Sequence, residues 1–168
     1  MPKIIENLRE RLLEETARQL ERDGYEAVTV RSIASAVGVG VGTVYNYFPS
    51  KEALTAACLL EDWTRCLEEI RACAEASAEP KPVLACIYGQ LIGFHKRHEA
   101  VFRAKSAVSG AAGSFRSYHA LLRSQLAKPL SGYCPNEFTA EFIAEGLLTW
   151  TMAGKPFDEI VEIIEKLF

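Results

Sequence analysis

The segment AVGVGVGTVYNYF, residues 36–48, decides how the rest of this chain is interpreted. Its glycines alternate with valines, and a threonine and two tyrosines follow. It fits either a glycine-rich loop that holds nucleotide phosphates or a tight turn between two short helices. Dinucleotide-binding loops read G-x-G-x-x-G after a strand, and P-loops read G-x-x-x-x-G-K before Ser or Thr. Counted from Gly38, both patterns need a glycine where this chain has Thr43, which excludes a phosphate loop.

The remaining interpretation is a helix-turn-helix, in which two short helices meet at a tight turn. Thr29 is a favourable N-cap for a helix over residues 30–37, and Gly38 can take the positive φ that ends such a helix. A second helix is expected over residues 41–48. The apolar positions of the two helices are Ile33, Ala34 and Val37 in the first, and Val44, Tyr45 and Phe48 in the second. The second helix of such a pair can enter the major groove of DNA.

The charge distribution favours the same interpretation. The whole chain has a formal net charge of −3, so a surface for nucleic acid has to be local. Asp and Glu supply 22 of the 168 residues, yet none lies between Glu26 and Glu52. A surface that approaches phosphates is better without carboxylates. A buried segment would also lack charge, but the two tyrosines, Thr43 and Asn46 make burial the less favourable explanation.

The segment TVRSIASAVGVGVGTVYNYFPSKEAL, residues 29–54, resembles the DNA-binding domain of the TetR family of transcriptional regulators. The likeness extends more loosely over residues 8–60. It rests on DGYEAVTVRSIA at the first helix of the pair, GVGVGTVYNYF at the turn and second helix, and SKEAL at the helix that follows. These motifs together are specific, whereas the rest of the chain matches the family only in its helical architecture.

The resemblance implies a set of contacts with double-stranded operator DNA. Thr29 and Arg31 would contact the phosphate backbone, and Lys51 would bind another phosphate beside a helix N-terminus. Base edges and further phosphates would be contacted from the second helix and its cap, by Gly40, Val41, Gly42, Thr43, Tyr45, Asn46 and Tyr47. The two tyrosines of this set would hold phosphates through their hydroxyls. The alternatives are a core contact for Tyr45 and a solvated surface position for Lys51.

Two residues depart from the family pattern. Gly40 stands where the family usually has Ser or Thr, so the second helix has a weaker cap. Val41 occupies a position that is often polar or basic, and it can offer only apolar contact, such as to a thymine methyl. No Arg or Lys lies between Val41 and Phe48, so bidentate contacts to guanine are not expected from this helix. Both departures concern the operator sequence and leave DNA binding itself expected.

The fold class expected for the whole chain is all-α, because no stretch alternates apolar and polar residues with period two. A three-helix DNA-binding domain with the helix-turn-helix is expected over residues 1–50, and a helical ligand-binding and dimerisation domain over 51–168. A first helix is expected over residues 3–22, followed by a left-handed residue at Gly24. Beyond the pair, helices are expected from residue 50 through Cys73 and over 82–97, 99–109, 115–130, 138–152 and 157–168.

The resemblance implies a homodimer that binds paired half-sites, together with an unknown small-molecule effector. The expected dimer interface consists of apolar residues near the C-terminus, namely Phe138, Phe142, Trp150, Phe157, Ile160, Val161, Ile164 and Phe168. A pocket for the effector is expected among Trp63, Cys66, Phe94, Phe102 and Trp150, although aromatic residues at helical spacing more often form plain core. The expected function is a repressor released from its operator by the effector. The alternative is a helical DNA-binding or protein-interaction module without a small-molecule ligand.

Other function classes find no support in the sequence. No nucleophile elbow, H-E-x-x-H motif or metal-spaced cysteine set occurs, so no enzyme, cofactor or metal site is expected. His95 and His98 are expected to be exposed. The five cysteines are odd in number and lack a C-x-x-C pair, which argues against a disulfide framework and for a reducing cytoplasm. Cys58, Cys66 and Cys73 are expected as buried small residues, with a redox sensor as the less favoured alternative. Neither a signal peptide nor a membrane span is expected.

Overall fold

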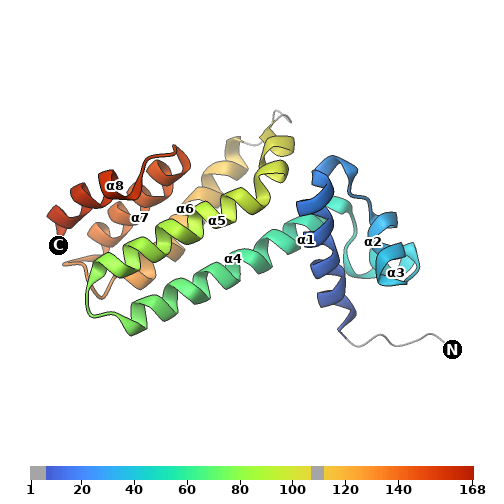
Figure 1. The fold of residues 1–168 in the computed structure, drawn as a ribbon, viewed down its shortest axis with the longest axis horizontal. Helices are drawn as coiled ribbons and strands as arrows, with labels where there is room; N and C mark the ends of the chain where they lie inside the picture. The colour runs from blue at the N-terminus through green and yellow to red at the C-terminus, as the bar shows by residue number, and fades with distance from the viewer. Residues whose placement is uncertain (1–6, 107–111) are drawn as a thin grey trace. The chain divides into compact units, whose positions relative to one another are not determined.

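The structure is a computed structural model that describes residues 7–106 and 112–168. Every regular element in these two ranges is helical, which confirms the all-α expectation (Figure 1). The helices are α1 (Leu8–Ala27), α2 (Val30–Val37), α3 (Val41–Tyr47), α4 (Lys51–Ala76), α5 (Pro80–Ser106), α6 (Ala112–Leu130), α7 (Glu137–Met152) and α8 (Phe157–Ile164), followed by the 3-10 helix η1 (Glu165–Leu167).

The chain divides into two compact units. The first consists of residues 1–62 and 97–107, and the second of residues 63–96 and 108–168. Both α4 and α5 contribute residues to each unit. The expected functional boundary after residue 50 stays a prediction.

The start and end of the first three helices follow from local signals. α2 spans the expected residues and α3 ends one residue earlier than expected. Gly24 has φ 77° and ψ 166°, so helical geometry is interrupted near the expected end of the first helix, although helical residues resume as far as Ala27. The expected start of this helix, residues 3–6, lies outside the described residues.

α5 differs from the expectation of two helices over 82–97 and 99–109. It is one helix, Pro80–Ser106, that continues through the expected break. No glycine or proline occurs between residues 94 and 106 to end it, and its buried face continues at helical spacing through Leu91, Phe94, His98 and Val101. Pro80 and Pro82 are tolerated because the amides of a first helical turn have no partner within the helix. α6 begins at Ala112, before the expected start at residue 115, and the expected end of the helix over 99–109 lies outside the described residues.

The core of the first unit holds the helix pair in place. α2 packs against both α1 and α3. The largest fully buried side chains of this unit come from α1, α2, α3 and α4 and from the connection before α2, namely Leu12, Val28, Ile33, Val44 and Leu54. α3 alone is too short to be stable in water, so it depends on this packing.

A polar cluster joins α4 and α5 within the first unit. The Asp62 carboxylate accepts a hydrogen bond from Arg97 Nε at 3.0 Å and lies 2.7 Å from His98 Nε2. Burial raises the pKa of Asp62, but hydrogen bonds with Arg97 and His98 outweigh this and leave the pKa below its ordinary value. The expectation that both histidines are exposed is therefore wrong for His98, which is 5% exposed because the unbroken α5 turns it inward.

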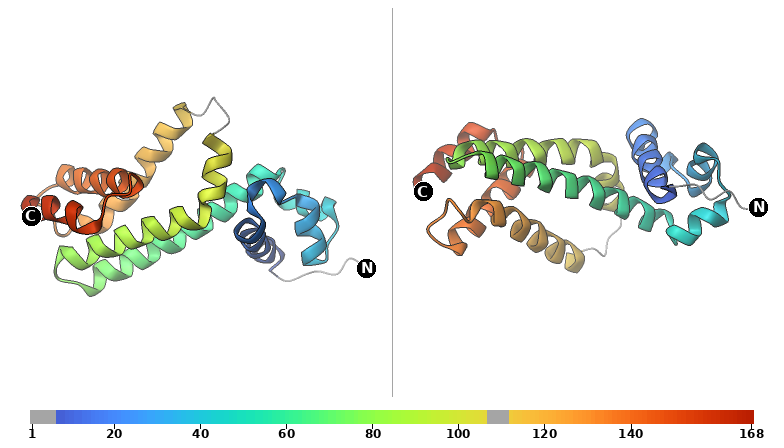
Figure 2. Two further views of the ribbon diagram at one scale, coloured as in Figure 1. Left: turned by 45° about the horizontal axis from the view of Figure 1, so that its top comes forward. Right: turned by 90° about the horizontal axis from the view of Figure 1, so that it is seen from below.

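The second unit is built around α7. Six of its residues are buried, among them Ile143, Ala144, Leu147 and Leu148, and α7 packs against both α6 and α8. α6 contributes Leu126 and Leu130 to this core, and α8 contributes Ile160, Val161 and Ile164. The ribbon views agree that α6, α7 and α8 lie together with the second-unit parts of α4 and α5 (Figure 2).

Neighbouring isoleucines of α8 test this assignment of the core. Ile164 is buried, whereas Ile163 is 65% exposed. We expect Ile164→Ala to lower the free energy of unfolding by about 2–4 kcal/mol, because it removes buried methyl groups and leaves a cavity. Ile163→Ala should change it by no more than about 0.5 kcal/mol. Urea unfolding at two protein concentrations measures both changes, and equal losses for the two variants would contradict the packing described.

Candidate nucleic-acid interface

The first turn of α2 is fixed by a reciprocal pair of hydrogen bonds. Ser32 N donates to Thr29 Oγ1 at 3.0 Å, and Thr29 N donates to Ser32 Oγ at 3.2 Å. The Ser32 hydroxyl also lies 2.6 Å from Oε1 of the buried Gln19 on α1. This capping box satisfies amides that the helix itself leaves without partners. It holds Thr29 and the exposed Arg31 at a defined end of α2.

The turn between α2 and α3 depends on a left-handed glycine. Gly38 has φ 80° and ψ 35°, and its amide donates to the carbonyls of Ala34 and Ser35. Val39 N also donates to Ala34 O at 2.9 Å. A residue with a Cβ is strained at this φ, so a glycine is favoured here. Gly40 is the N-cap of α3 and makes no side-chain cap hydrogen bond, which leaves α3 with the weak cap that the sequence predicts.

α3 has one face in the core and one face in solvent. Val44 is fully buried and the C-cap Phe48 is 5% exposed. Tyr45 and Tyr47 are about half exposed, at 49% and 48%, so the alternative of a core role for Tyr45 finds no support. The remaining predicted contact residues of α3, which are exposed or half-buried, are Val41, Gly42, Thr43 and Asn46.

Two cations lie beside this surface. Lys51 Nζ donates a hydrogen bond to the Tyr25 carbonyl and lies 4.2 Å from the centre of the Tyr25 ring. Its position is therefore fixed by the end of α1 rather than left to solvent. Arg9 was not predicted from the sequence; its guanidinium lies 5.8 Å from the centre of the Phe48 ring. No motif marks Arg9, because its position depends on how α1 packs beside the end of α3.

Comparison with known proteins identifies this arrangement. Residues 12–58, which contain α2, the turn and α3, match the family described as bacterial regulatory proteins, tetR family. The HTH-type transcriptional repressor KstR from Mycolicibacterium smegmatis is 34% identical over 134 residues, or 77% of this chain. The chain belongs to the TetR family. The KstR match covers 66% of that relative, just under two thirds of its length.

Solved structures of transcriptional regulators share the fold over most of this chain. A protein from Streptomyces coelicolor A3(2), assigned as a transcriptional regulator, has a TM-score of 0.71 at 15% identity, covering 95% of this chain and 96% of the other. FadR from Bacillus subtilis, solved in complex with stearoyl-CoA, has a TM-score of 0.57 at 17% identity, covering 92% and 96%. The TetR family comprises transcription regulators and not enzymes. None of the described helices of this family member is long and apolar enough to span a membrane.

The expected effector residues of this TetR-family chain are only partly brought together. Trp63 and Cys66 of α4 and Phe94 of α5 are buried in the second unit. The Trp63 and Phe94 rings pack edge to face, with 5.2 Å between the ring centres. Trp63 Nε1 donates to Gln125 Oε1 on α6 at 2.8 Å. Phe102 belongs to the first unit, and Trp150 is 53% exposed on α7.

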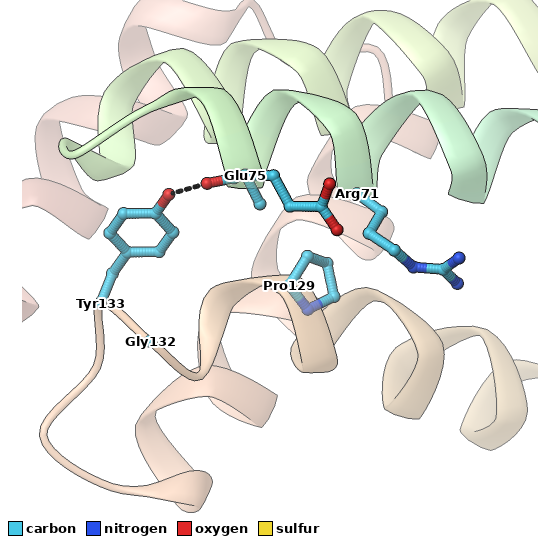
Figure 3. A pocket seen from close by; sticks show the side chains of 6 residues that line it. Arg71, Glu75, Pro129, Gly132 and Tyr133 are labelled. Atoms are coloured by element: carbon cyan, nitrogen blue, oxygen red, sulfur yellow. Dashed lines mark hydrogen bonds between the residues drawn. The ribbon is translucent and has the colours of Figure 1, made fainter.

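A shallow groove of about 410 Å³ lies elsewhere in the second unit (Figure 3). Arg71, Ala74 and Glu75 of α4 line one side, with Pro129, Gly132 and Tyr133 opposite. The Tyr133 hydroxyl bridges the two sides, lying 2.8 Å from the Ala74 carbonyl and 2.7 Å from the Ser77 carbonyl. None of the expected effector residues lines this groove.

The expected dimer-interface residues divide into a buried and an exposed group. Ile160, Val161 and Ile164 are buried in the second unit. Phe157 is half-buried, and the centre of its ring lies 5.3 Å from the centre of the Tyr88 ring. The exposed members are Phe138 at 75%, Phe142 at 56%, Trp150 at 53% and Phe168 at 41%. An interface with a second copy therefore has these exposed aromatic residues available.

Proposed function

We propose that this chain is a DNA-binding transcriptional repressor that binds its operator as a homodimer and is released from it by a small-molecule effector. The observation that carries the proposal is the outer face of α3. It carries half-exposed tyrosines and exposed polar residues, and no acidic residue lies between Glu26 and Glu52. KstR, a relative named as a transcriptional repressor, supports the choice of repressor.

The proposed DNA contacts divide into phosphate and base contacts. Thr29 and Arg31 at the start of α2, Tyr45 and Tyr47 on α3, and Lys51 bind phosphates, which fixes the position of the protein on the duplex. Arg9 is added to this group because its guanidinium lies beside the end of α3.

Base edges are contacted by the first turn of α3 and by Asn46. Gly40 and Gly42 have no side chains, and a Cβ at Gly42 would meet no atom within 4 Å in the part of the chain that the structure describes, apart from its own helix backbone. The chain itself therefore does not require glycine at 42, and we infer that close approach to DNA does. Val41 and Thr43 offer methyl groups that suit thymine, and Asn46 can bond to adenine, so the half-site should be rich in A·T pairs.

Arg31→Ala and Tyr47→Phe test the phosphate contacts. Each should weaken binding roughly tenfold, because each removes a hydrogen bond to a charged group. The loss should be similar on all sequences, and Arg31→Ala should lower the salt slope of log K by about 1. Fluorescence anisotropy with sites selected from random DNA, measured over a series of salt concentrations, gives both quantities.

Arg71→Ala is the matched control, because Arg71 is an exposed arginine of the second unit that lines the shallow groove. It should leave affinity and salt slope unchanged. Equal effects of Arg31→Ala and Arg71→Ala would argue against α2 as a phosphate-binding element. Failure to select any site would overturn the DNA-binding proposal as a whole.

The proposed homodimer uses the exposed stripe of α7. Phe138, Phe142, Gly146 and Trp150 are spaced four residues apart, so they form a continuous ridge along one side of the helix. An exposed aromatic ridge of this kind is typical of a protein interface. Gly146 lies in the helix interior, where glycine costs about 1 kcal/mol relative to alanine. Apart from the backbone of its own helix, no atom of the described residues would lie within 4 Å of a Cβ at Gly146. A partner helix that packs closely at this point explains the glycine.

Gly146→Leu should convert the dimer into a monomer at micromolar concentration, because the side chain would hold the two α7 helices apart. Gly89→Leu is a matched control, since Gly89 is exposed in α5 and a Cβ there also meets nothing. It should leave the dimer intact. Sedimentation velocity measures both, and a dimeric Gly146→Leu variant would move the interface away from this ridge.

The proposed effector binds beside Trp63, where α4, α5 and α6 of the second unit meet. The Trp63 ring there packs against the Phe94 ring and donates a hydrogen bond to Gln125. A ligand that displaces this bond would shift α4. α4 has no glycine or proline from Lys51 to Ala76 to absorb such a shift, and it carries Lys51 at its first turn. The result would be a population shift between operator-binding and released states.

Stearoyl-CoA is the first compound to test, because FadR of similar fold was solved with it. At saturation we expect it to weaken operator binding at least tenfold, and Trp63→Ala should reduce this effect. Isothermal titration establishes saturation and anisotropy measures operator release. Unchanged operator affinity at a saturated site would contradict release by this ligand. If no acyl-CoA or other small apolar compound binds at all, a DNA-binding module without a ligand becomes the better description.

A further inference from the structure

Two cysteines from different helices meet in the second unit. Cys73 lies on α4 and Cys86 on α5, with their sulfur atoms 2.6 Å apart. Both are thiols, and both side chains are partly exposed. The other cysteines differ, because Cys58 and Cys66 are buried and the partly exposed Cys134 lies in the turn between α6 and α7.

The approach of these cysteines follows from the α4–α5 hairpin. α4 ends at Ala76 and α5 begins at Pro80, so only a short turn joins them. The two helices run antiparallel and side by side in every ribbon view (Figures 1 and 2). Cys73 is in the last turn of α4 and Cys86 is in the second turn of α5. Disulfide sulfur atoms are about 2.05 Å apart, so closure needs a movement of only about half an ångström.

We propose that Cys73 and Cys86 form a two-electron oxidation site that closes to an intramolecular disulfide with a peroxide as oxidant. Cys73 loses its proton, the resulting thiolate attacks one oxygen of hydrogen peroxide, and the O–O bond breaks to give a Cys73 sulfenic acid and hydroxide. The hydroxide takes up the proton that Cys73 lost and becomes the first water. The Cys86 sulfur then attacks the sulfenic sulfur, the S–S bond forms, and the hydroxyl leaves as a second water with the Cys86 proton. Two thiols are oxidised and one peroxide is reduced.

The environment of Cys86 indicates the order of these steps. Burial, together with the neighbouring Cys73, raises the pKa of Cys86 to about 12. Cys86 is therefore protonated at neutral pH and suits the second, resolving step. The thiolate is the nucleophilic form of cysteine, so the raised pKa of Cys86 makes this thiol unsuited to the first attack. In a reducing environment the bond would be transient, because dithiols reduce exposed disulfides.

The disulfide would join the ends of the α4–α5 hairpin. It closes the chain between residues 73 and 86, which restricts the unfolded chain and stabilises the folded second unit. This inference stands apart from the proposed function, because neither cysteine belongs to the proposed DNA, effector or dimer surfaces. Loss of DNA binding in the selection experiment would leave it unaffected, and its own failure would leave the DNA-binding proposal intact.

Mass spectrometry of the full chain tests the proposal directly. Reduced protein treated with a slight molar excess of hydrogen peroxide should lose about 2 Da under denaturing, non-reducing conditions, and dithiothreitol should restore the mass. Trypsin does not separate the two cysteines, because Lys81 precedes a proline. Cleavage after Glu75 with a glutamate-specific protease does, so the oxidised protein should give one joined pair of peptides. Oxidation should also raise the melting temperature by roughly 5–10 °C.

Single variants supply the controls. Cys73→Ser and Cys86→Ser should each abolish both the mass loss and the thermal shift, and Cys86→Ser should instead retain oxygen on Cys73. Cys134→Ser, which removes the other partly exposed thiol, should behave as the wild type. A mass loss of the same size in Cys73→Ser would overturn the proposal. So would a product that carries only added oxygen or consists of disulfide-linked dimers.

Discussion

The candidate DNA surface depends on the constraint that Gly38 places on the path of the chain. α3 has only seven residues, and its inner face is held by Val44 and by Phe48 beyond its end. A helix this short is stable only when the preceding turn orients it so that its inner face packs against the core. The left-handed conformation of Gly38 and the hydrogen bonds to Ala34 and Ser35 fix that angle. The outer residues of α3 are therefore presented by a rigid support.

Local signals made this part of the fold predictable from the sequence. Thr29 and Gly38 mark the ends of α2 by capping and by left-handed geometry, and both effects involve only neighbouring residues. The family motif and the absence of carboxylates then predict DNA contacts for the exposed residues. The break in α5 was predicted wrongly, because a charged stretch with two histidines resembles a loop when its partner is unknown. The Asp62 carboxylate, 36 positions away from His98, gives that stretch a reason to remain helical.

Non-local contacts account for the rest of what the sequence could not reveal. The stripe Ile160, Val161 and Ile164 reads equally well as a core or as an interface, since both bury apolar residues. Only the positions of α7 and α8 distinguish the two for this chain. The proximity of Cys73 and Cys86 depends on the length of the hairpin turn and on the rotation of both helices. Arg9 is a third example, because no sequence motif predicts that its guanidinium lies near the Phe48 ring.

The capping box at Thr29 has a consequence for the energetics of recognition. Its oxygen already accepts a hydrogen bond from the Ser32 amide, which locks the side chain in one rotamer before any partner arrives. A hydroxyl that accepts still has one proton to give, and a phosphate oxygen can only accept. A threonine side chain without this bond would lose rotational entropy when it contacts DNA. For Thr29 that entropy is already lost on folding. In the proposed phosphate contact, the bond that begins α2 would therefore also preorganise the Thr29 hydroxyl as a donor.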